Sequence, residues 1–187
     1  MPMSEIPDLS SMSLAEVAAA AEAATLPPVE TWHPVNSGDS LMRIAADGTW
    51  YHDGGPITRA NMVRLFSTIL RREPDGGFVL VTPAEKLSIE VEDVPFQAVE
   101  VKIEGEGTAR RLAFRLNTGD LVVADSSHPL RFGATESVPA PYVMVRGGME
   151  ARLSRAVYYE LAEIALAEAA KPPGVWSEGV FFAMATE

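Results

Sequence analysis

Residues 98–104 read Ala-Val-Glu-Val-Lys-Ile-Glu, and residues 112–116 read Leu-Ala-Phe-Arg-Leu. In both stretches, apolar residues alternate with charged or small ones. A period of two is typical of a β-strand with one face buried and the other in water. The segments between such strands are too short for crossover connections, so we predict a sheet built mainly from antiparallel neighbours.

The strand pattern continues on both sides of these stretches. Short apolar runs separated by turn residues predict seven strands, at 78–81, 87–91, 98–103, 112–116, 121–123, 130–132 and 142–145. A helix from Met149 to about Ala169 should follow and end before the Pro-Pro-Gly at 172–174. The apolar tail after it is expected either to add a strand or to pair with another molecule.

The N-terminal part has a different pattern. The Asp47-Gly48 pair between two short apolar runs predicts a tight hairpin, and residues 57–72 carry the spacing of an amphipathic helix. Residues 14–24 are rich in Ala and follow Ser13, which with Glu16 has the spacing of a capping box. This stretch predicts a helix in a loosely docked arm.

Together these patterns predict an α+β protein. A small N-terminal hairpin-plus-helix unit would pack on a part made of seven mainly antiparallel strands and a C-terminal helix. The expected parts are an arm at 1–35, the N-terminal unit at 36–76, the seven strands and their helix at 77–170, and a tail at 171–187. A strand, a Gly-Gly pair and an Arg-bearing helix occur at 49–70 and again at 142–166, so an internal duplication is one interpretation.

Composition excludes several classes of function. The 187 residues contain no Cys, which excludes disulfides, thiolate metal sites and cysteine nucleophiles. With 15 basic and 26 acidic residues the net charge is −11, which argues against a nucleic-acid partner. No apolar run approaches the ~20 residues of a membrane span, and the start lacks the pattern of a signal peptide. We therefore expect a cytoplasmic protein with no membrane partner.

The order of charges on the last predicted helix is unusual. Arginines cluster at its N-terminal end and acids follow, which is the reverse of what the helix dipole favours. One interpretation is an anion site, in which the backbone N–H groups of Gly147 and Gly148 act with the side chains of Arg152 and Arg155. The other is that these arginines pair with Glu150 and other acids of this acidic chain.

Three residues of the N-terminal part are further candidates for the site. Arg59 follows Thr58, a candidate N-cap, and Arg43 lies within a predicted strand. If the two Gly-Gly helices face one another, these arginines and those of the last helix would converge on a cleft between the two parts. Trp50 could form part of an aromatic wall for a ligand, although packing in the core or at its rim is the interpretation we favour.

Evidence for catalysis is sparse. The sequence has no His-Glu-x-x-His, no Gly-x-Ser-x-Gly and no Gly-rich nucleotide-binding motif, so no cofactor or metal is expected. Asp47, His52 and Asp53 come nearest to a metal-binding set, but such residues also form turns. We predict a non-catalytic protein that binds a small anionic ligand or a protein partner. The alternatives are a hydrolase acting on a phosphorylated small molecule and a purely structural adaptor.

Several short motifs resemble one protein family. These are Asp47-Gly48-Thr49-Trp50, Gly55-Pro56-Ile57 with Arg59, Leu65-Phe66, Leu80-Val81-Thr82-Pro83 with Glu85-Lys86, Val91-Glu92-Asp93 with Pro95-Phe96, and Glu150-Ala151-Arg152-Leu153 with Arg155 and Tyr158-Tyr159. In this order they resemble the proteobacterial domain-of-unknown-function 1285 family over about residues 36–166. The resemblance implies a two-part α+β fold with an internal duplication and a C-terminal part similar to pleckstrin-homology-like barrels. It also implies a ligand or partner site between the two parts and a role in signal transduction.

Overall fold

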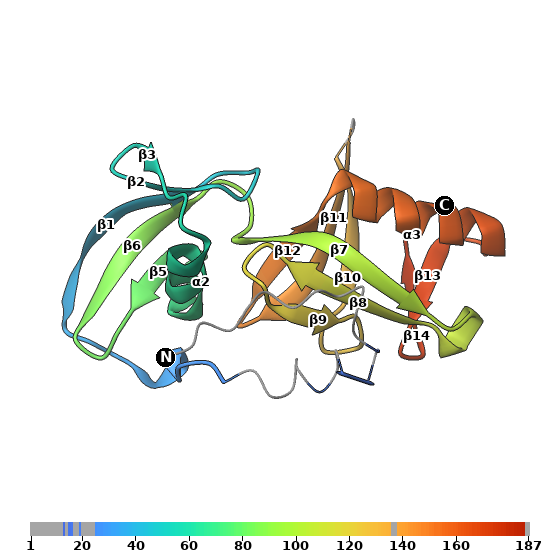
Figure 1. Cartoon of the computed structure of the whole chain (residues 1–187), viewed down its shortest axis with the longest axis horizontal. Coiled ribbons are helices and arrows are strands. Elements are labelled where there is room, and N and C mark those ends of the chain that lie inside the picture. The colour runs from blue at the N-terminus through green and yellow to red at the C-terminus, as the bar shows by residue number, and fades with distance from the viewer. Residues whose placement is uncertain (1–12, 14, 17–18, 20–24, 136–137, 186–187) are drawn as a thin grey trace. The chain divides into compact units, whose positions relative to one another are not determined.

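The computed structural model describes residues 13, 15–16, 19, 25–135 and 138–185. These fall into two compact units, each built around one sheet (Figure 1). The first unit contains residues 25–95 together with Gly147–Met149, and the second contains the rest. Most of the predicted Ala-rich helix lies outside the described residues. Ser13 and Glu16 are described, and they exchange the two hydrogen bonds of a capping box, at 2.6 and 3.2 Å.

The first sheet has six strands in the order β3-β2-β1-β6-β5-β4. A short 3₁₀ turn, η2 (Val29–Thr31), precedes it, and the helix α2 (Ala60–Thr68) connects β3 to β4. The strands are β1 (Asn36–Ile44), β2 (Trp50–His52), β3 (Gly55–Pro56), β4 (Leu70–Arg72), β5 (Phe78–Val81) and β6 (Glu85–Val91). The predicted hairpin is confirmed, because β1 pairs antiparallel with β2 across the Asp47-Gly48 turn.

The second sheet has six strands in the order β10-β11-β12-β7-β8-β9. They are β7 (Phe96–Glu104), β8 (Arg111–Leu116), β9 (Leu121–Val123), β10 (Leu130–Thr135), β11 (Val138–Arg146) and β12 (Met149–Leu153). A 3₁₀ turn, η3 (Gly107–Ala109), lies between β7 and β8, and the helix α3 (Arg155–Glu168) follows β12. The chain is therefore a mostly-sheet α+β protein.

The two sheets share one strand order. In each, the first and last strands of the series lie at the centre and pair in parallel, β1 with β6 and β7 with β12. The remaining strands extend outward as antiparallel neighbours. The prediction that the connections are too short for parallel pairing was wrong for these two pairs. In each sheet, the four intervening strands and their loops together form a connection long enough to join the two parallel strands.

The predicted run of seven strands is divided between the two sheets. The strands β5 and β6, which we expected to open the barrel, pair with β4 and β1 in the first sheet. Alternating burial along a strand shows which face packs but not which strand is its neighbour. The sequence pattern therefore identified these strands without identifying their sheet.

The helix predicted at 57–72 is shorter in the structure. It ends at Thr68, and residues 70–72 form β4, which pairs with β5. Arg59, rather than Thr58, is the N-cap residue, and its side chain makes no capping hydrogen bond. Leu70 is 1% exposed in the sheet, so its burial there outweighs its propensity for helix.

The helix predicted from Met149 begins six residues later, at Arg155. Residues 149–153 form β12, in which Met149, Ala151 and Leu153 are buried in alternation. The N-cap is Ser154, whose side chain accepts a hydrogen bond from the Val157 N–H at 3.2 Å. Gly147 and Gly148 therefore form the turn of a β-hairpin and do not start a helix.

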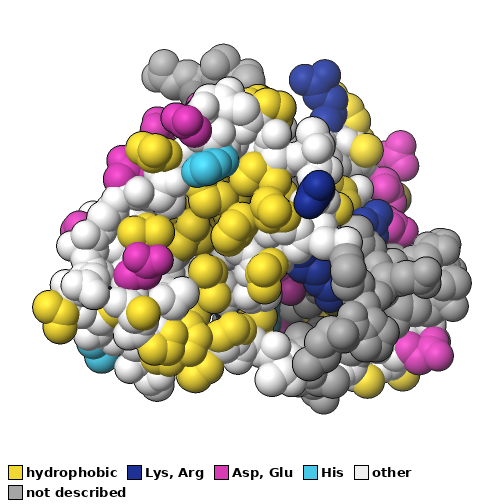
Figure 2. All heavy atoms as spheres, turned by 60° about the vertical axis from the view of Figure 1, so that its left-hand side comes forward, with side chains coloured by type: hydrophobic (Ala, Val, Ile, Leu, Met, Phe, Trp, Pro, Cys, Tyr) yellow, Lys and Arg dark blue, Asp and Glu magenta, His cyan; other side chains and the backbone are white. Residues whose placement is uncertain are grey.

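Each unit buries its own apolar core. In the first, Ile44, Trp50, Leu70 and Val81 are at most 1% exposed. In the second, the most deeply buried large side chains belong to the sheet and to α3, and they are Phe96, Leu112, Phe114, Leu116, Val143 and Leu161. Large apolar side chains also reach the surface (Figure 2), and Leu65 of α2 is 64% exposed.

The tail forms a hairpin of β13 (Gly174–Ser177) and β14 (Val180–Ala183). Ser177 is fully buried, accepts a hydrogen bond from the Leu112 N–H at 3.0 Å and donates one to the Ala124 carbonyl at 2.7 Å. The tail thus docks on its own unit, but as a separate two-stranded sheet and not as the added strand that the sequence suggested. Among the described residues, no helix is long and apolar enough to cross a membrane.

Candidate functional site

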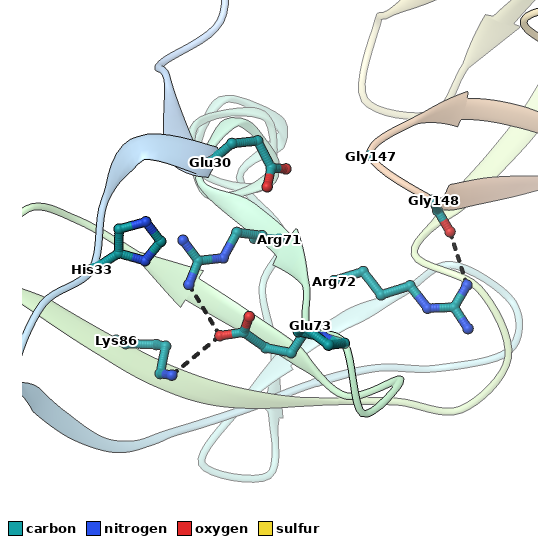
Figure 3. Close-up of a pocket in the computed structure, with 9 residues that line it drawn as sticks. Glu30, His33, Arg71, Arg72, Glu73, Lys86, Gly147 and Gly148 are labelled. Atoms are coloured by element: carbon teal, nitrogen blue, oxygen red, sulfur yellow. Dashed lines mark hydrogen bonds and ion pairs between the residues drawn. The ribbon is translucent and has the colours of Figure 1, made fainter.

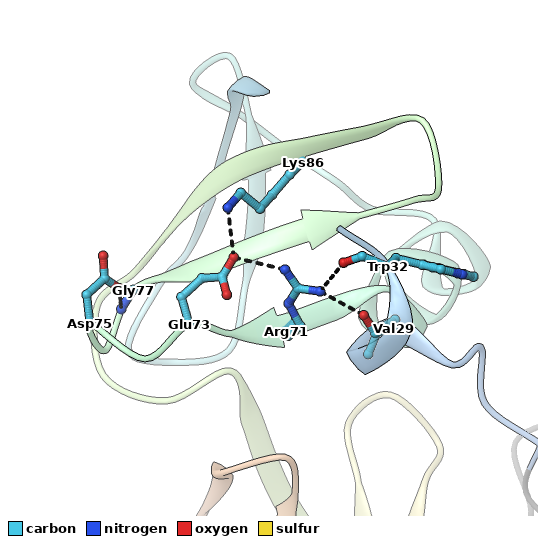
Figure 4. A network of polar contacts seen from close by, with 7 residues as sticks. All are labelled: Val29, Trp32, Arg71, Glu73, Asp75, Gly77 and Lys86. Carbon is cyan, nitrogen blue, oxygen red and sulfur yellow. Dashed lines mark hydrogen bonds and ion pairs between the residues drawn. The ribbon is translucent and has the colours of Figure 1, made fainter. Parts of the chain in front are cut away.

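A buried arginine organises one side of the first unit. Arg71 lies in the middle of β4 and is only 6% exposed. Its Nη1 donates hydrogen bonds to the carbonyls of Val29 and Trp32, each at 2.7 Å (Figure 4). These two contacts attach the segment around η2 to the sheet and fix the orientation of the guanidinium group.

Glu73 lies between Arg71 and Lys86. Its Oε1 accepts a hydrogen bond from Arg71 Nη2 at 3.1 Å and lies 3.2 Å from Lys86 Nζ. Burial raises the pKa of the Glu73 carboxyl, but the hydrogen bonds and charges of Arg71 and Lys86 outweigh burial, so its pKa lies below the ordinary value. Glu73 is therefore ionised at neutral pH.

These residues line a pocket of about 580 Å³ (Figure 3). Its lining consists of Glu30, His33, Arg71, Arg72, Glu73, Pro74, Lys86, Gly147 and Gly148. Three of these side chains are basic and two are acidic, and a histidine adds a further hydrogen-bonding group. In a chain with a net charge of −11, this is a locally basic pocket.

Arg71 also has an unused donor. No acceptor contacts its buried Nε within the part of the chain that the structure describes. Nε and Nη2 form one edge of the guanidinium, the edge that typically binds both oxygens of a carboxylate or phosphate. Among the described residues, that edge makes a single bond, to Glu73.

Arg72 completes the basic side of the pocket from the opposite face of β4. Successive residues of a strand point to opposite faces, and Arg72 is accordingly exposed whereas Arg71 is buried. Its Nη1 donates a hydrogen bond to the Gly148 carbonyl at 2.9 Å, and its guanidinium carbon lies 5.9 Å from the centroid of the Phe78 ring. Arg72 is thus exposed to solvent, while its contacts with Gly148 and Phe78 hold its guanidinium group in place.

Of the residues proposed from sequence, Gly147 and Gly148 line this pocket. Both have positive φ angles, 56° and 74°, which the tight turn between β11 and β12 requires. Because these glycines lie in a hairpin turn and not at the start of a helix, no helix dipole contributes to the anion site predicted at this position.

Arg43 lines a different pocket of the first unit, of about 530 Å³. Its guanidinium pairs with Glu92 and lies over the Tyr51 ring, 4.4 Å from the ring centroid. Asp39, Asp53 and Glu90 also line this pocket, so its surroundings are acidic. This charge disfavours an anion there.

Trp50 and Arg59 lie apart from both pockets. Trp50 is 1% exposed in the core of the first unit, as expected from the packing interpretation. Arg59 is exposed at the start of α2. Neither residue lines either of the pockets described above.

Arg152 and Arg155 belong to the second unit. Arg152 is in β12, with its guanidinium carbon 5.9 Å from the centroid of the Tyr142 ring, and Arg155 is the exposed first residue of α3. Glu150, a proposed partner of these arginines, pairs with Arg131 at 3.0 Å. The nearby Arg146 lies 3.7 Å from Asp120, which agrees with the interpretation that acids of the chain neutralise its arginines.

Of the candidate metal set, Asp47 and Asp53 lie in two turns and His52 is the last residue of β2. Asp47 Oδ1 accepts a hydrogen bond from the Thr49 N–H at 2.9 Å, so its carboxylate stabilises the hairpin turn. Asp53 has a positive φ of 48° in the next turn. No group of three or more His, Asp or Glu side chains in the described ranges is arranged to hold a metal ion.

Sequence reasoning missed the residues that carry the charge of the basic pocket. The sequence pattern places Arg71 and Arg72 at the end of the predicted helix at 57–72, and Lys86 is not among the candidate site residues. The available signal was the consecutive Arg71-Arg72 immediately before the turn residues Pro74-Asp75-Gly76-Gly77. A helix that continued to this turn would have left both charges in water, whereas a strand buries one of them.

Comparison with known proteins identifies both units. Residues 27–94 match the model of the N-terminal domain of DUF1285, a domain of unknown function, and residues 95–184 match the model of its C-terminal domain. No curated protein matches the chain.

Two crystal structures are similar to this chain. A DUF1285 family protein from Silicibacter pomeroyi DSS-3 is 44% identical, with a TM-score of 0.79 over 89% of this chain and 93% of that one. A DUF1285 family protein from Shewanella baltica OS155 is 26% identical, with a TM-score of 0.53 over 67% of this chain and 92% of that one. The two domain models together with the first of these structures show that the chain belongs to the DUF1285 family.

Proposed function

We propose that this protein is a non-catalytic binding protein whose first unit takes up a small anion in the pocket of Arg71, Arg72 and Lys86. The observation that carries the proposal is the half-filled edge of Arg71, which is buried, is held by two backbone carbonyls and has an unpartnered Nε in the described part of the chain. An arginine fixed in this way loses little entropy when it binds an oxyanion.

The charge of the pocket supports an anion rather than a cation. Arg72 and Lys86 flank the Arg71–Glu73 pair, and the Lys86 side chain is 37% exposed, so its ammonium group is accessible to a ligand. Carboxylates and phosphates are the groups that such a set of forked and point-like donors binds best.

Two finer features of the fold are also part of the proposal. An internal duplication is supported by the shared strand order, with a central parallel pair in each sheet. A pleckstrin-homology-like character of the second unit is supported by its curved sheet followed by α3. A role of the bound anion in signalling remains a prediction.

The proposal is tested by titrating the full chain with inorganic phosphate and with citrate at constant ionic strength. We expect each anion to raise the melting temperature in a saturable way, because a ligand that binds only the folded state stabilises it by mass action. Arg72→Ala and Lys86→Met should abolish this rise without greatly changing the melting temperature of the free protein.

Arg155→Ala is the matched control. It removes an exposed arginine that was proposed from sequence and lies outside the pocket, so the rise should persist in this variant. The proposal is overturned if neither anion stabilises the protein, or if the pocket variants respond as the wild type does.

A further inference from the structure

We propose that Glu73 is an internal competitor for the pocket, and that the ligand is a phosphate or carboxylate group that displaces it from Arg71 and Lys86. This inference rests on the proposed function. It assigns the chemistry of the ligand and a mechanism by which the chain tunes its own affinity.

The first argument is that Arg71 does not depend on Glu73 for its position. Its Nη1 is held by the Val29 and Trp32 carbonyls, both at 2.7 Å, and its side chain is 7% exposed. If the Glu73 carboxylate moves away, the guanidinium keeps these two contacts. The binding edge therefore remains in place for another anion.

The second argument is that Glu73 satisfies its two cations incompletely. Arg71 and Lys86 both contact the same oxygen, Oε1, and Arg71 Nε has no acceptor in the described residues. A carboxylate or phosphate with two free oxygens could accept from Nε and Nη2 together. A phosphate has a third oxygen that could meet Lys86, so an exchange of anions adds hydrogen bonds rather than only replacing them.

The third argument is that Glu73 can leave without unfolding its turn. Its backbone is fixed by hydrogen bonds with Gly76 and Gly77, at 2.9 and 2.7 Å, and these do not involve the side chain. The side chain is 18% exposed, so it has a path to solvent. Displacement requires only rotation about side-chain bonds.

The competitor remains charged under ordinary conditions. Burial raises the pKa of the Glu73 carboxyl, but the contacts with Arg71 and Lys86 lower it by more, so the resulting pKa lies below the ordinary value. A ligand at neutral pH thus competes with a carboxylate and not with a neutral acid.

The experiment measures the dissociation constants of inorganic phosphate and of acetate by calorimetry for the wild type, Glu73→Gln and Glu73→Ala. We expect both substitutions to tighten binding of at least one of these probes by about tenfold, as for removal of one charge-assisted competitor. Glu73→Ala is included because the amide oxygen of the Gln in Glu73→Gln could still accept a hydrogen bond from the Nε and Nη2 edge of Arg71. A preference for phosphate over acetate would identify the ligand group as a phosphate, and the reverse as a carboxylate.

Asp75→Asn is the matched control. Asp75 is an exposed acid in the same turn, and its carboxylate accepts a hydrogen bond from the Gly77 N–H at 2.8 Å. Its loss should change affinity by less than about twofold at physiological ionic strength, where exposed charges are screened. An equal gain in this variant would show a general charge effect and overturn the displacement mechanism.

The two levels of the proposal fail differently. If the wild type binds phosphate and Lys86→Met weakens it, but both Glu73 variants bind as the wild type does, only the displacement mechanism is wrong. If no protein binds either probe, including Glu73→Ala with its competitor removed, the anion pocket itself is wrong.

Discussion

Arg110 Nη2 lies 2.6 Å from Glu168 Oε1, and this contact joins a buried arginine immediately before β8 to the last residue of α3. Arg110 is 6% exposed, and its Nε and Nη1 have no partner in the described part of the chain. Glu168 thus forms an ion pair with a charge that water barely reaches.

Glu168→Gln should destabilise the second unit by about 2 kcal/mol, because it leaves the buried guanidinium without a counter-charge. The free energy of unfolding from urea titration measures this loss. Glu163→Gln, an exposed acid on the same helix, is the control and should change stability by less than about 0.5 kcal/mol. Equal stability of the two variants would show that water compensates Arg110.

Stability should fall steeply in acid. Glu168 has a lowered pKa, first because it accepts a hydrogen bond from Arg110, and Glu73 and Asp125 also have lowered pKa values because their hydrogen bonds outweigh burial. A carboxyl with a lower pKa in the folded state binds fewer protons there than in the unfolded state. Its contribution is therefore complete above the unfolded pKa of about 4 and is lost as pH falls through the lowered folded value.

This acid dependence is measured by urea titration at a series of pH values from neutral to strongly acidic. The Glu73→Gln and Glu168→Gln variants lack part of the titrating component, so their stability curves should be flatter below about pH 4.5 than that of the wild type. Parallel curves would contradict the assignment of the acid dependence to these contacts.

Glu160 should behave in the opposite way. Its pKa is raised, by burial first and then by the negative charges of Glu100 and Glu163. Ionised Glu160 is therefore unfavourable in the folded state, and Glu160→Gln should raise the melting temperature at neutral pH. The effect should be small at this exposed position and should diminish in high salt, where the repulsion is screened. A lower melting temperature in the variant would show a contact that Glu160 supports.

The sequence predicted local structure better than strand partners. The Asp47-Gly48 hairpin, the capping box at Ser13 and the existence of the strands follow from short-range chemistry. The central parallel pairs do not, because residues far apart in the chain form them and no local pattern specifies such a partner.

The residues of the basic pocket were hidden for a related reason. Arg71 is charged, and a charged residue is normally read as exposed, yet here two carbonyls from the segment around η2 compensate its burial. Val99 is the converse case. The register shift between Ala98 and Glu100 leaves it 40% exposed, although strict alternation placed it on the apolar face with Val101.

The last prediction concerns the docked tail hairpin. Ser177 bridges Leu112 of β8 and Ala124 just after β9 through one hydroxyl group, and all three residues are fully buried. Ser177→Ala preserves the volume of the site almost unchanged but leaves the Leu112 N–H and the Ala124 carbonyl without this partner. Because both groups are shielded from water, the loss should cost about 2 kcal/mol of unfolding free energy in urea titration. Ser126→Ala, at an exposed position, controls for the substitution itself and should leave stability unchanged. If Ser177→Ala also left it unchanged, the hydroxyl bridge would have no role in docking the tail, which would then be held by its buried apolar side chains and by the contacts of Glu178 with Arg110 and Arg111.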